Sequence, residues 1–124
     1  MKTTWVLGLV VAAGVALTAL ATRTGGSPLA PDPRIAIFLQ RGCNDCHAVS
    51  ALKIRALHDV APDLTYAYGD VVIRYGVDLE SFLDNPTGVM RLMLASHIRL
   101  NPVERDSIVQ ILRGLYVQRV ALRH

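Results

Sequence analysis

The hydrophobic and polar positions divide the chain into two parts with different patterns. Residues 5–21 are apolar apart from Thr18, and no charged side chain occurs in residues 3–22. Further along, apolar residues return at helical spacing between polar and Pro/Gly-rich stretches. The pattern predicts an N-terminal apolar helix within residues 1–22, a Gly/Pro linker over residues 23–32, and one helical domain over residues 33–124.

The apolar stretch of residues 5–21 admits two interpretations. A secretory signal peptide would be cleaved after the small-residue site Ala19-Leu20-Ala21. An uncleaved anchor is favoured by length, because 17 residues exceed the roughly 7–15 of a signal core and reach the roughly 17–25 that span a bilayer. Both interpretations predict a periplasmic or extracytoplasmic domain. The chain would contact the membrane through residues 5–21 if the leader is retained.

Helix start and stop signals outline two short helices of the domain. A first helix is predicted over residues 33–41, with Asp32 as its N-cap and Gly42 ending it. A second short helix is predicted to follow Asp78 and to stop before Pro86.

The last helix has the clearest sequence pattern. Asn101 offers a cap, Pro102 fits the first helical position, and Glu104 lies three residues after the cap. The apolar positions that then repeat at helical spacing are Ile108, Ile111, Leu112 and Leu115. Residues 66–77 remain ambiguous because they are β-branched and aromatic but too few to define a sheet. The outline is an all-α fold with substantial loop.

Composition narrows the class of protein. A chain of 124 residues holds one small domain. Hydrophobic residues make up 52% and charged residues 19%, which excludes a disordered chain. The formal net charge of +3 is too small for a nucleic-acid interface. The two cysteines are too few for a multi-disulfide scaffold or a four-cysteine zinc site.

Both cysteines fall in the sequence Cys43-Asn44-Asp45-Cys46-His47, the C-x-x-C-H attachment motif of c-type haem. Two thiols at this spacing reach the two vinyl groups on one edge of a porphyrin, and the next residue is then held under the iron. A redox dithiol is disfavoured because the βαβ context is missing. A zinc site with His58 is disfavoured because thiolates so close to a histidine give poor tetrahedral geometry. The motif therefore predicts one covalent haem c, attached through Cys43 and Cys46, with His47 as iron ligand.

At this point residues 33–120 resemble the class I monohaem cytochromes c. The matching features, in the family's order, are Phe38 and Gly42 ahead of the motif and the stretches 61–65, 81–86 and 100–112. The resemblance implies a small cytochrome c-like helical fold around one haem, with crossing N- and C-terminal helices. It also implies that the backbone carbonyl of Pro62 accepts the ring N–H of His47.

The family's sixth iron ligand is normally a methionine, which raises the haem potential. Met90, Met93 and His97 lie 43, 46 and 50 residues after His47. Met93 is preferred from its spacing to the last helix, and Met90 is the alternative because it follows Gly88 and Val89. The family's proline after the ligand is missing at both methionines, and residues 89–98 also fit a helical turn with the two methionines in the core. His97 or an open site is the remaining choice.

Basic and hydroxyl side chains are candidates for the haem propionates. Arg74 is the first choice, and the others are Arg55, Tyr66, Tyr68 and Tyr75. Arg113, Arg119 and Arg123 make the C-terminal end basic, which either complements the helix dipole or offers a docking face to an acidic partner.

These features predict an electron carrier rather than an enzyme. The haem iron would cycle between Fe(II) and Fe(III), in a membrane-tethered cytochrome or a cytochrome subunit of a respiratory or photosynthetic complex. The expected partners are redox proteins: a quinol-oxidising complex, a terminal oxidase, a reaction centre or a dehydrogenase. The alternative is the haem subunit of an oxidoreductase, or a haem-based sensor, with an open sixth coordination site.

Overall fold

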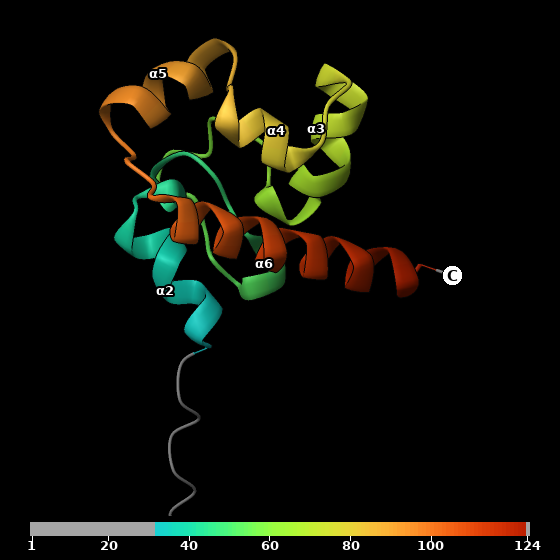
Figure 1. The fold of residues 1–124 in the computed structure, drawn as a ribbon. Helices are drawn as coiled ribbons and strands as arrows, with labels where there is room; N and C mark the ends of the chain where they lie inside the picture. Colours follow the sequence, from blue (N-terminus) through green and yellow to red (C-terminus); the bar gives the residue numbers. More distant parts are fainter. Residues whose placement is uncertain (1–31, 124) are drawn as a thin grey trace, which may run out of the picture. The chain divides into compact units, whose positions relative to one another are not determined.

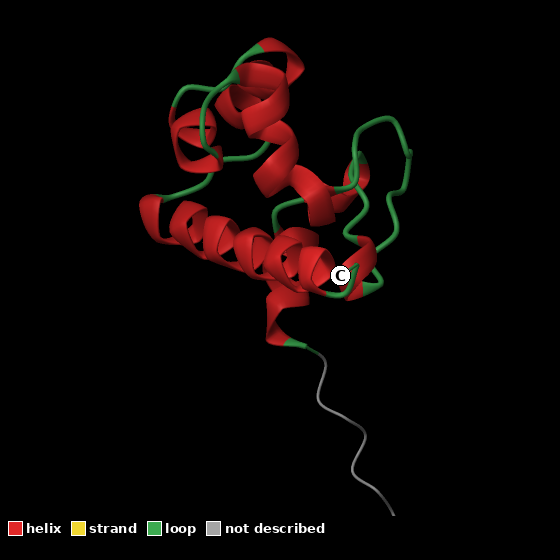
Figure 2. Ribbon diagram, turned by 90° about the vertical axis from the view of Figure 1, so that its right-hand side faces the viewer, coloured by secondary structure: helices red, strands yellow, loops and turns green. Residues whose placement is uncertain are grey.

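The computed structural model describes residues 32–123. The predicted apolar leader, residues 5–21, lies outside these residues, as does the linker up to residue 31. The described chain is all-α, as predicted, with helices joined by loops and 3-10 turns (Figure 2). Its β-structure is confined to one isolated bridge between Val49 and Ile54.

The first described helix is α2 (Pro33–Gln40), which confirms the predicted start and ends one residue early. The Asp32 side chain accepts a hydrogen bond from the Arg34 backbone N–H at 3.0 Å, so it caps the helix as predicted. Gly42 has φ +69, a left-handed conformation that glycine adopts at little cost, and it turns the chain out of the helix. The motif therefore begins directly after this turn, in η2 (Cys43–Asp45).

Two further 3-10 turns, η3 (Ser50–Leu52) and η4 (Leu64–Tyr66), lead into α3 (Ala67–Tyr75). The ambiguous residues 66–77 are thus mostly helical. Tertiary packing, and not β-propensity, determines the secondary structure of this segment, because α3 buries Val71 and packs against α6. A Cβ on Gly69 would lie 2.6 Å from the Tyr116 ring, so glycine permits the close approach of these two helices.

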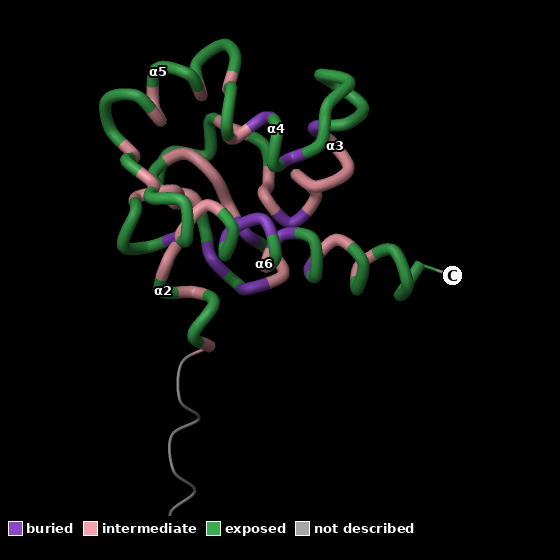
Figure 3. The backbone as a smooth tube through the Cα atoms, viewed as in Figure 1, coloured by how far each residue is buried: buried purple, intermediate pink, exposed green. Residues whose placement is uncertain are grey.

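The predicted short helix after Asp78 is α4 (Leu79–Asp84), capped by the Asp78 side chain, which accepts from the Ser81 N–H at 2.7 Å. It is followed by α5 (Gly88–Ser96), a segment for which the sequence left helix and ligand loop open. None of the residues of α5 is buried, and Figure 3 shows the helix green and pink along its length.

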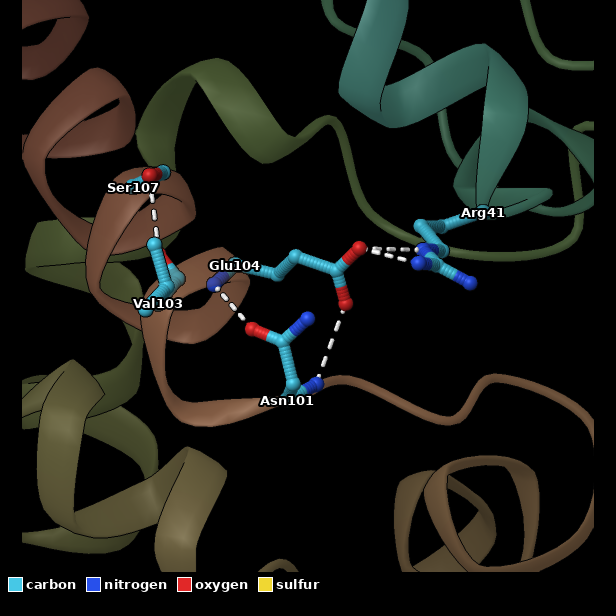
Figure 4. Close-up of polar contacts among 5 residues, drawn as sticks. All are labelled: Arg41, Asn101, Val103, Glu104 and Ser107. Atoms are coloured by element: carbon cyan, nitrogen blue, oxygen red, sulfur yellow. Dashed lines mark hydrogen bonds and ion pairs between the residues drawn. The ribbon is translucent and has the colours of Figure 1, made fainter.

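The last helix, α6 (Pro102–Ala121), begins with the predicted capping box. The Asn101 side chain accepts from the Glu104 N–H at 2.9 Å, and the Glu104 side chain accepts from the Asn101 N–H at 3.0 Å (Figure 4). Its buried residues are Ile108, Val109, Leu112 and Leu115. α2, α3 and α4 all pack against α6, which runs across the view in Figure 1. Within residues 32–123, no helix has both the length and the apolarity that crossing a membrane requires.

Candidate functional site

An open cavity of about 150 Å³ lies between the helices of the domain. Its walls are mostly apolar and come from all five helices. The apolar lining residues include Phe38, Leu64, Val71, Leu79, Phe82, Leu94, Ile98, Leu100, Ile108 and Leu112. Such a lining excludes water and strengthens electrostatic interactions inside the cavity.

The C-x-x-C-H segment forms part of the cavity wall. Cys43 and His47 both line the cavity, and the His47 backbone N–H donates to the Cys43 carbonyl at 3.0 Å. Cys46 is half-buried beside them but is not among the lining residues. Both thiols are free. This short segment therefore presents one thiol, that of Cys43, and one imidazole, that of His47, from the same part of the wall.

The Cys43 thiol is held in its neutral form. Burial raises the pKa of Cys43 to about 11, and the nearby Asp45 carboxylate adds to the rise. Because the thiolate is the reactive form, this thiol reacts slowly at neutral pH once the domain has folded.

The His47 ring is oriented by Pro62. Its Nδ1 lies 2.7 Å from the Pro62 carbonyl oxygen, which is the pair that the family resemblance implies. A carbonyl oxygen only accepts, so Nδ1 carries a proton, and in the neutral ring the lone pair is then on Nε2. A ligating histidine has this arrangement, with the second ring nitrogen donating to a fixed acceptor.

The loop that carries Pro62 is fixed by Asp63 and Thr65. The Asp63 carboxylate accepts from the Thr65 N–H at 2.8 Å and from the Ser50 N–H at 3.2 Å. Partial burial raises the pKa of Asp63, but the hydrogen bonds from Ser50 and Thr65 outweigh it and lower the pKa below 3.8. Thr65 is fully buried, and its Oγ1 accepts from the Ala51 N–H at 3.0 Å. The Pro62 carbonyl therefore has a rigid support.

The candidate sixth ligands all lie on α5 or at its end. Met90 lines the cavity, whereas Met93 is not among the lining residues. His97 is the exposed C-cap of α5, and its backbone N–H donates to the Met93 carbonyl at 2.8 Å. The sequence prediction preferred Met93. In the structure, however, α5 is a continuous helix, and the residues of it that face the cavity are Met90 and Leu94, which lie one turn apart.

The candidate propionate donors divide into two groups. Arg74 and Tyr75 line the cavity, together with Asp70, which the sequence reasoning did not single out. Arg55, Tyr66 and Tyr68 are not among the lining residues.

Two of these tyrosines pack instead against the C-terminal half of α6. The Arg113 guanidinium lies 5.9 Å from the Tyr68 ring centre, and that of Arg123 lies 5.6 Å from the Tyr66 ring centre. At these distances cations interact with aromatic faces, so two of the three C-terminal arginines have a packing role.

Two ion pairs near the cavity were not foreseen. Arg41 pairs with Glu104, its Nε lying 2.8 Å from the carboxylate (Figure 4), and Arg105 pairs with Asp84. The partners are 63 and 21 positions apart, so no sequence periodicity marks them. Glu104 accepts from the Asn101 N–H and from Arg41, and these hydrogen bonds lower the pKa of Glu104.

No protein-family model, curated protein or solved structure matches this chain. In residues 32–123, no three His, Cys, Asp or Glu side chains converge to hold a bare metal ion. The cavity wall presents the His47 imidazole, the Cys43 thiol beside it, and the Met90 thioether from α5.

Proposed function

We propose that this chain carries one haem c, bonded through Cys43 and Cys46, and transfers electrons as its iron cycles between Fe(III) and Fe(II). The observation that carries the proposal is the cavity, whose apolar walls include both His47 and Met90. The oriented ring of His47, with Nδ1 bonded to the Pro62 carbonyl, supports it further. Together they would supply a nitrogen and a sulfur ligand to the iron of the haem.

The residues present fit such a group. The two thiols would form thioether bonds by adding across its vinyl groups, so that the thiol hydrogen ends on carbon and no oxidant is needed. His47 would supply Nε2, and its hydrogen bond to Pro62 would raise the basicity of the ligand. Met90 is preferred over Met93 as the second ligand because Met90 lines the cavity. Arg74, which also lines the cavity, would donate to a propionate.

The other residues of the cavity control the surroundings of the group. The bound haem supplies reversible one-electron chemistry. The apolar side chains of α3, α4 and α6 exclude water, which disfavours the extra charge of the oxidised iron. A thioether ligand acts in the same direction and raises the potential.

We also propose a cellular location and a class of partner for the domain. The apolar residues 5–21 would tether the domain to the extracytoplasmic face of a membrane, or direct its export if cleaved. Its partners would be redox proteins that supply and accept single electrons.

A second candidate function is a haem enzyme or sensor in which the sixth coordination site opens. The observation that favours it is α5, which carries the candidate ligand and has no buried residue. A helix held so lightly allows an external ligand to compete for the iron.

The test is expression of the full chain in an exporting host with haem-attachment machinery. The expected product keeps its pigment after denaturation, with one haem per chain by mass. The variant Cys43→Ala with Cys46→Ala loses the pigment, whereas the control Ser107→Ala, at an exposed position of α6, keeps it. Wild-type protein without covalent haem would overturn the proposal. A high-spin protein that binds carbon monoxide readily would shift the choice to the second candidate.

A further inference from the structure

The first turn of α6 carries two neighbouring side chains of opposite charge, and each pairs with a different wall of the cavity. Glu104 pairs with Arg41, the C-cap of α2, two residues before Cys43. Arg105 pairs with Asp84, the last residue of α4, four residues before α5 begins. The Glu104 pair therefore joins α6 to a residue shortly before the C-x-x-C-H motif. The Arg105 pair joins α6 to the segment that leads to Met90.

The Asp84 pair is placed where the fold has few other restraints. The hydrogen bonds of α5 in the described chain stay within the helix and its cap: Ser96 donates to the Leu92 carbonyl, and the N–H groups of His97 and Ile98 donate to the Met93 carbonyl. No ion pair of the described residues involves α5 itself. α5 begins at Gly88 with φ +59, a left-handed conformation that glycine adopts at little cost. The position of α5 therefore depends on its apolar contacts and on where α4 ends.

The location of Asp84 has a local cost. An acidic side chain in the last turn of a helix faces the negative end of the helix dipole, which disfavours it there. The pair with Arg105 offsets this cost by joining the end of α4 to α6. Asp84 thus stabilises a contact between elements at the expense of its own helix.

We propose that the Asp84–Arg105 pair is a latch that positions α5, and so holds its ligand on the iron. Asp84 and Arg105 are positioning residues, since they act through α4 and α5 and not by touching the group. Opening the latch raises the population of the state in which α5 has moved away and an external ligand takes the sixth position. This inference rests on the proposed haem and on a methionine ligand from α5, and it does not depend on whether Met90 or Met93 ligates.

The size of the effect follows from the exposure of the pair. The side chains of Asp84 and Arg105 are 64% and 31% exposed, so the pair belongs with surface salt bridges of modest strength. The apparent affinity for an external ligand scales with the population of the open state. Loss of the pair therefore raises that affinity about two- to five-fold. Salt screens the pair, so added salt raises the affinity of the wild type more than that of a variant without the pair.

The test measures imidazole binding to the oxidised, haem-loaded full chain, followed by loss of the near-infrared sulfur-to-iron band. Asp84→Asn and Arg105→Gln are each expected to bind imidazole about two- to five-fold more tightly, with a smaller salt dependence. The charge exchange, Asp84→Arg with Arg105→Asp, is expected to return affinity toward the wild-type value. The matched control is Glu104→Gln, which breaks the neighbouring pair on the same turn and is expected to leave imidazole affinity unchanged.

Three results would overturn the latch while the haem proposal stands: unchanged affinity in both single variants, an equal rise in Glu104→Gln, or no recovery on charge exchange. A loaded wild type that is already five-coordinate would also overturn it. Wild-type protein without haem would overturn the proposed function itself, and the latch with it.

Discussion

Two walls of the cavity are built in different ways. Segment 43–66 is tied by backbone hydrogen bonds that cross between its turns: Leu57 and His58 donate to Asn44 and Asp45, and Leu64 donates to Ala48, at 2.8–3.0 Å. It also contains fully buried Val49 and Thr65. The wall formed by α5, by contrast, has no buried residue and no such cross-links in the described chain. One iron ligand would therefore sit on a rigid support, and the other on a helix with few restraints.

The largest expected effect compares one leucine from each wall. Leu52 in η3 is 6% exposed, and Leu52→Ala is expected to lower the free energy of unfolding by about 2–5 kcal/mol. Leu92 in α5 is 66% exposed, and Leu92→Ala is expected to cost less than about 0.5 kcal/mol. Urea unfolding of the two variants measures this. Equal losses would remove the distinction between the walls.

A second prediction tests α3, which lines the cavity and packs on α6. Gly69→Ala is expected to cost about 1–3 kcal/mol, because the new Cβ meets the Tyr116 ring. The control is Gly114→Ala in α6, where nothing lies within 4 Å of the new Cβ. There the substitution is expected to stabilise by roughly 0.5–1 kcal/mol. Thermal unfolding of both variants gives the comparison, and a neutral Gly69→Ala would contradict the packing.

A third prediction compares two threonines. Thr65→Val leaves the Ala51 N–H without its acceptor in the buried part of the rigid wall, and is expected to cost about 1–3 kcal/mol. Thr87→Val, at the start of α5, removes no side-chain capping bond and is expected to stay within about 0.5 kcal/mol of the wild type. Chemical denaturation measures both. A harmless Thr65→Val would show that this hydrogen bond does not support the Pro62 loop.

The smallest expected effect is the loss of stability at acid pH through Asp63. The folded-state pKa of Asp63 is lowered, so its contribution to stability is fully present above the ordinary value of 3.8 and is lost as pH falls through the folded-state value. Asp63 is half-buried and still screened by solvent, so the contribution is below about 1 kcal/mol. Asp63→Asn is expected to unfold with a flatter dependence on pH below 4. If stability depends on pH as steeply in the variant as in the wild type, the pKa of Asp63 does not differ between the folded and unfolded states.

The sequence predicted the helices whose ends carry local signals. Asp32, Asp78 and the Asn101–Glu104 capping box each mark a helix start, and the structure confirms all three. α3 was not resolved from sequence, because its β-branched and aromatic residues adopt a helix only through packing on α6. Local capping chemistry can be read from neighbouring residues, whereas tertiary packing cannot.

The candidate site divides in the same way. The C-x-x-C-H motif can be read from five neighbouring residues, and the family resemblance implies the contact between His47 and Pro62. In the structure, His47 Nδ1 does lie against the Pro62 carbonyl oxygen. Which of Met90 and Met93 is the better candidate ligand depends on which face of α5 turns to the cavity. The spacing of the two methionines along the chain does not determine this. Asp70 and the Asp84–Arg105 pair carry no sequence pattern at all, since only the folded chain brings them to the cavity or to each other.

The most direct test of the electron-carrier function is a potentiometric titration of the purified, haem-loaded chain, followed by its visible and near-infrared absorption. We predict one reversible one-electron transition, with the near-infrared sulfur-to-iron band present in the oxidised form and lost on reduction. A chain that holds no haem, or one whose haem lacks this band, stays high-spin and binds carbon monoxide on reduction, would contradict it.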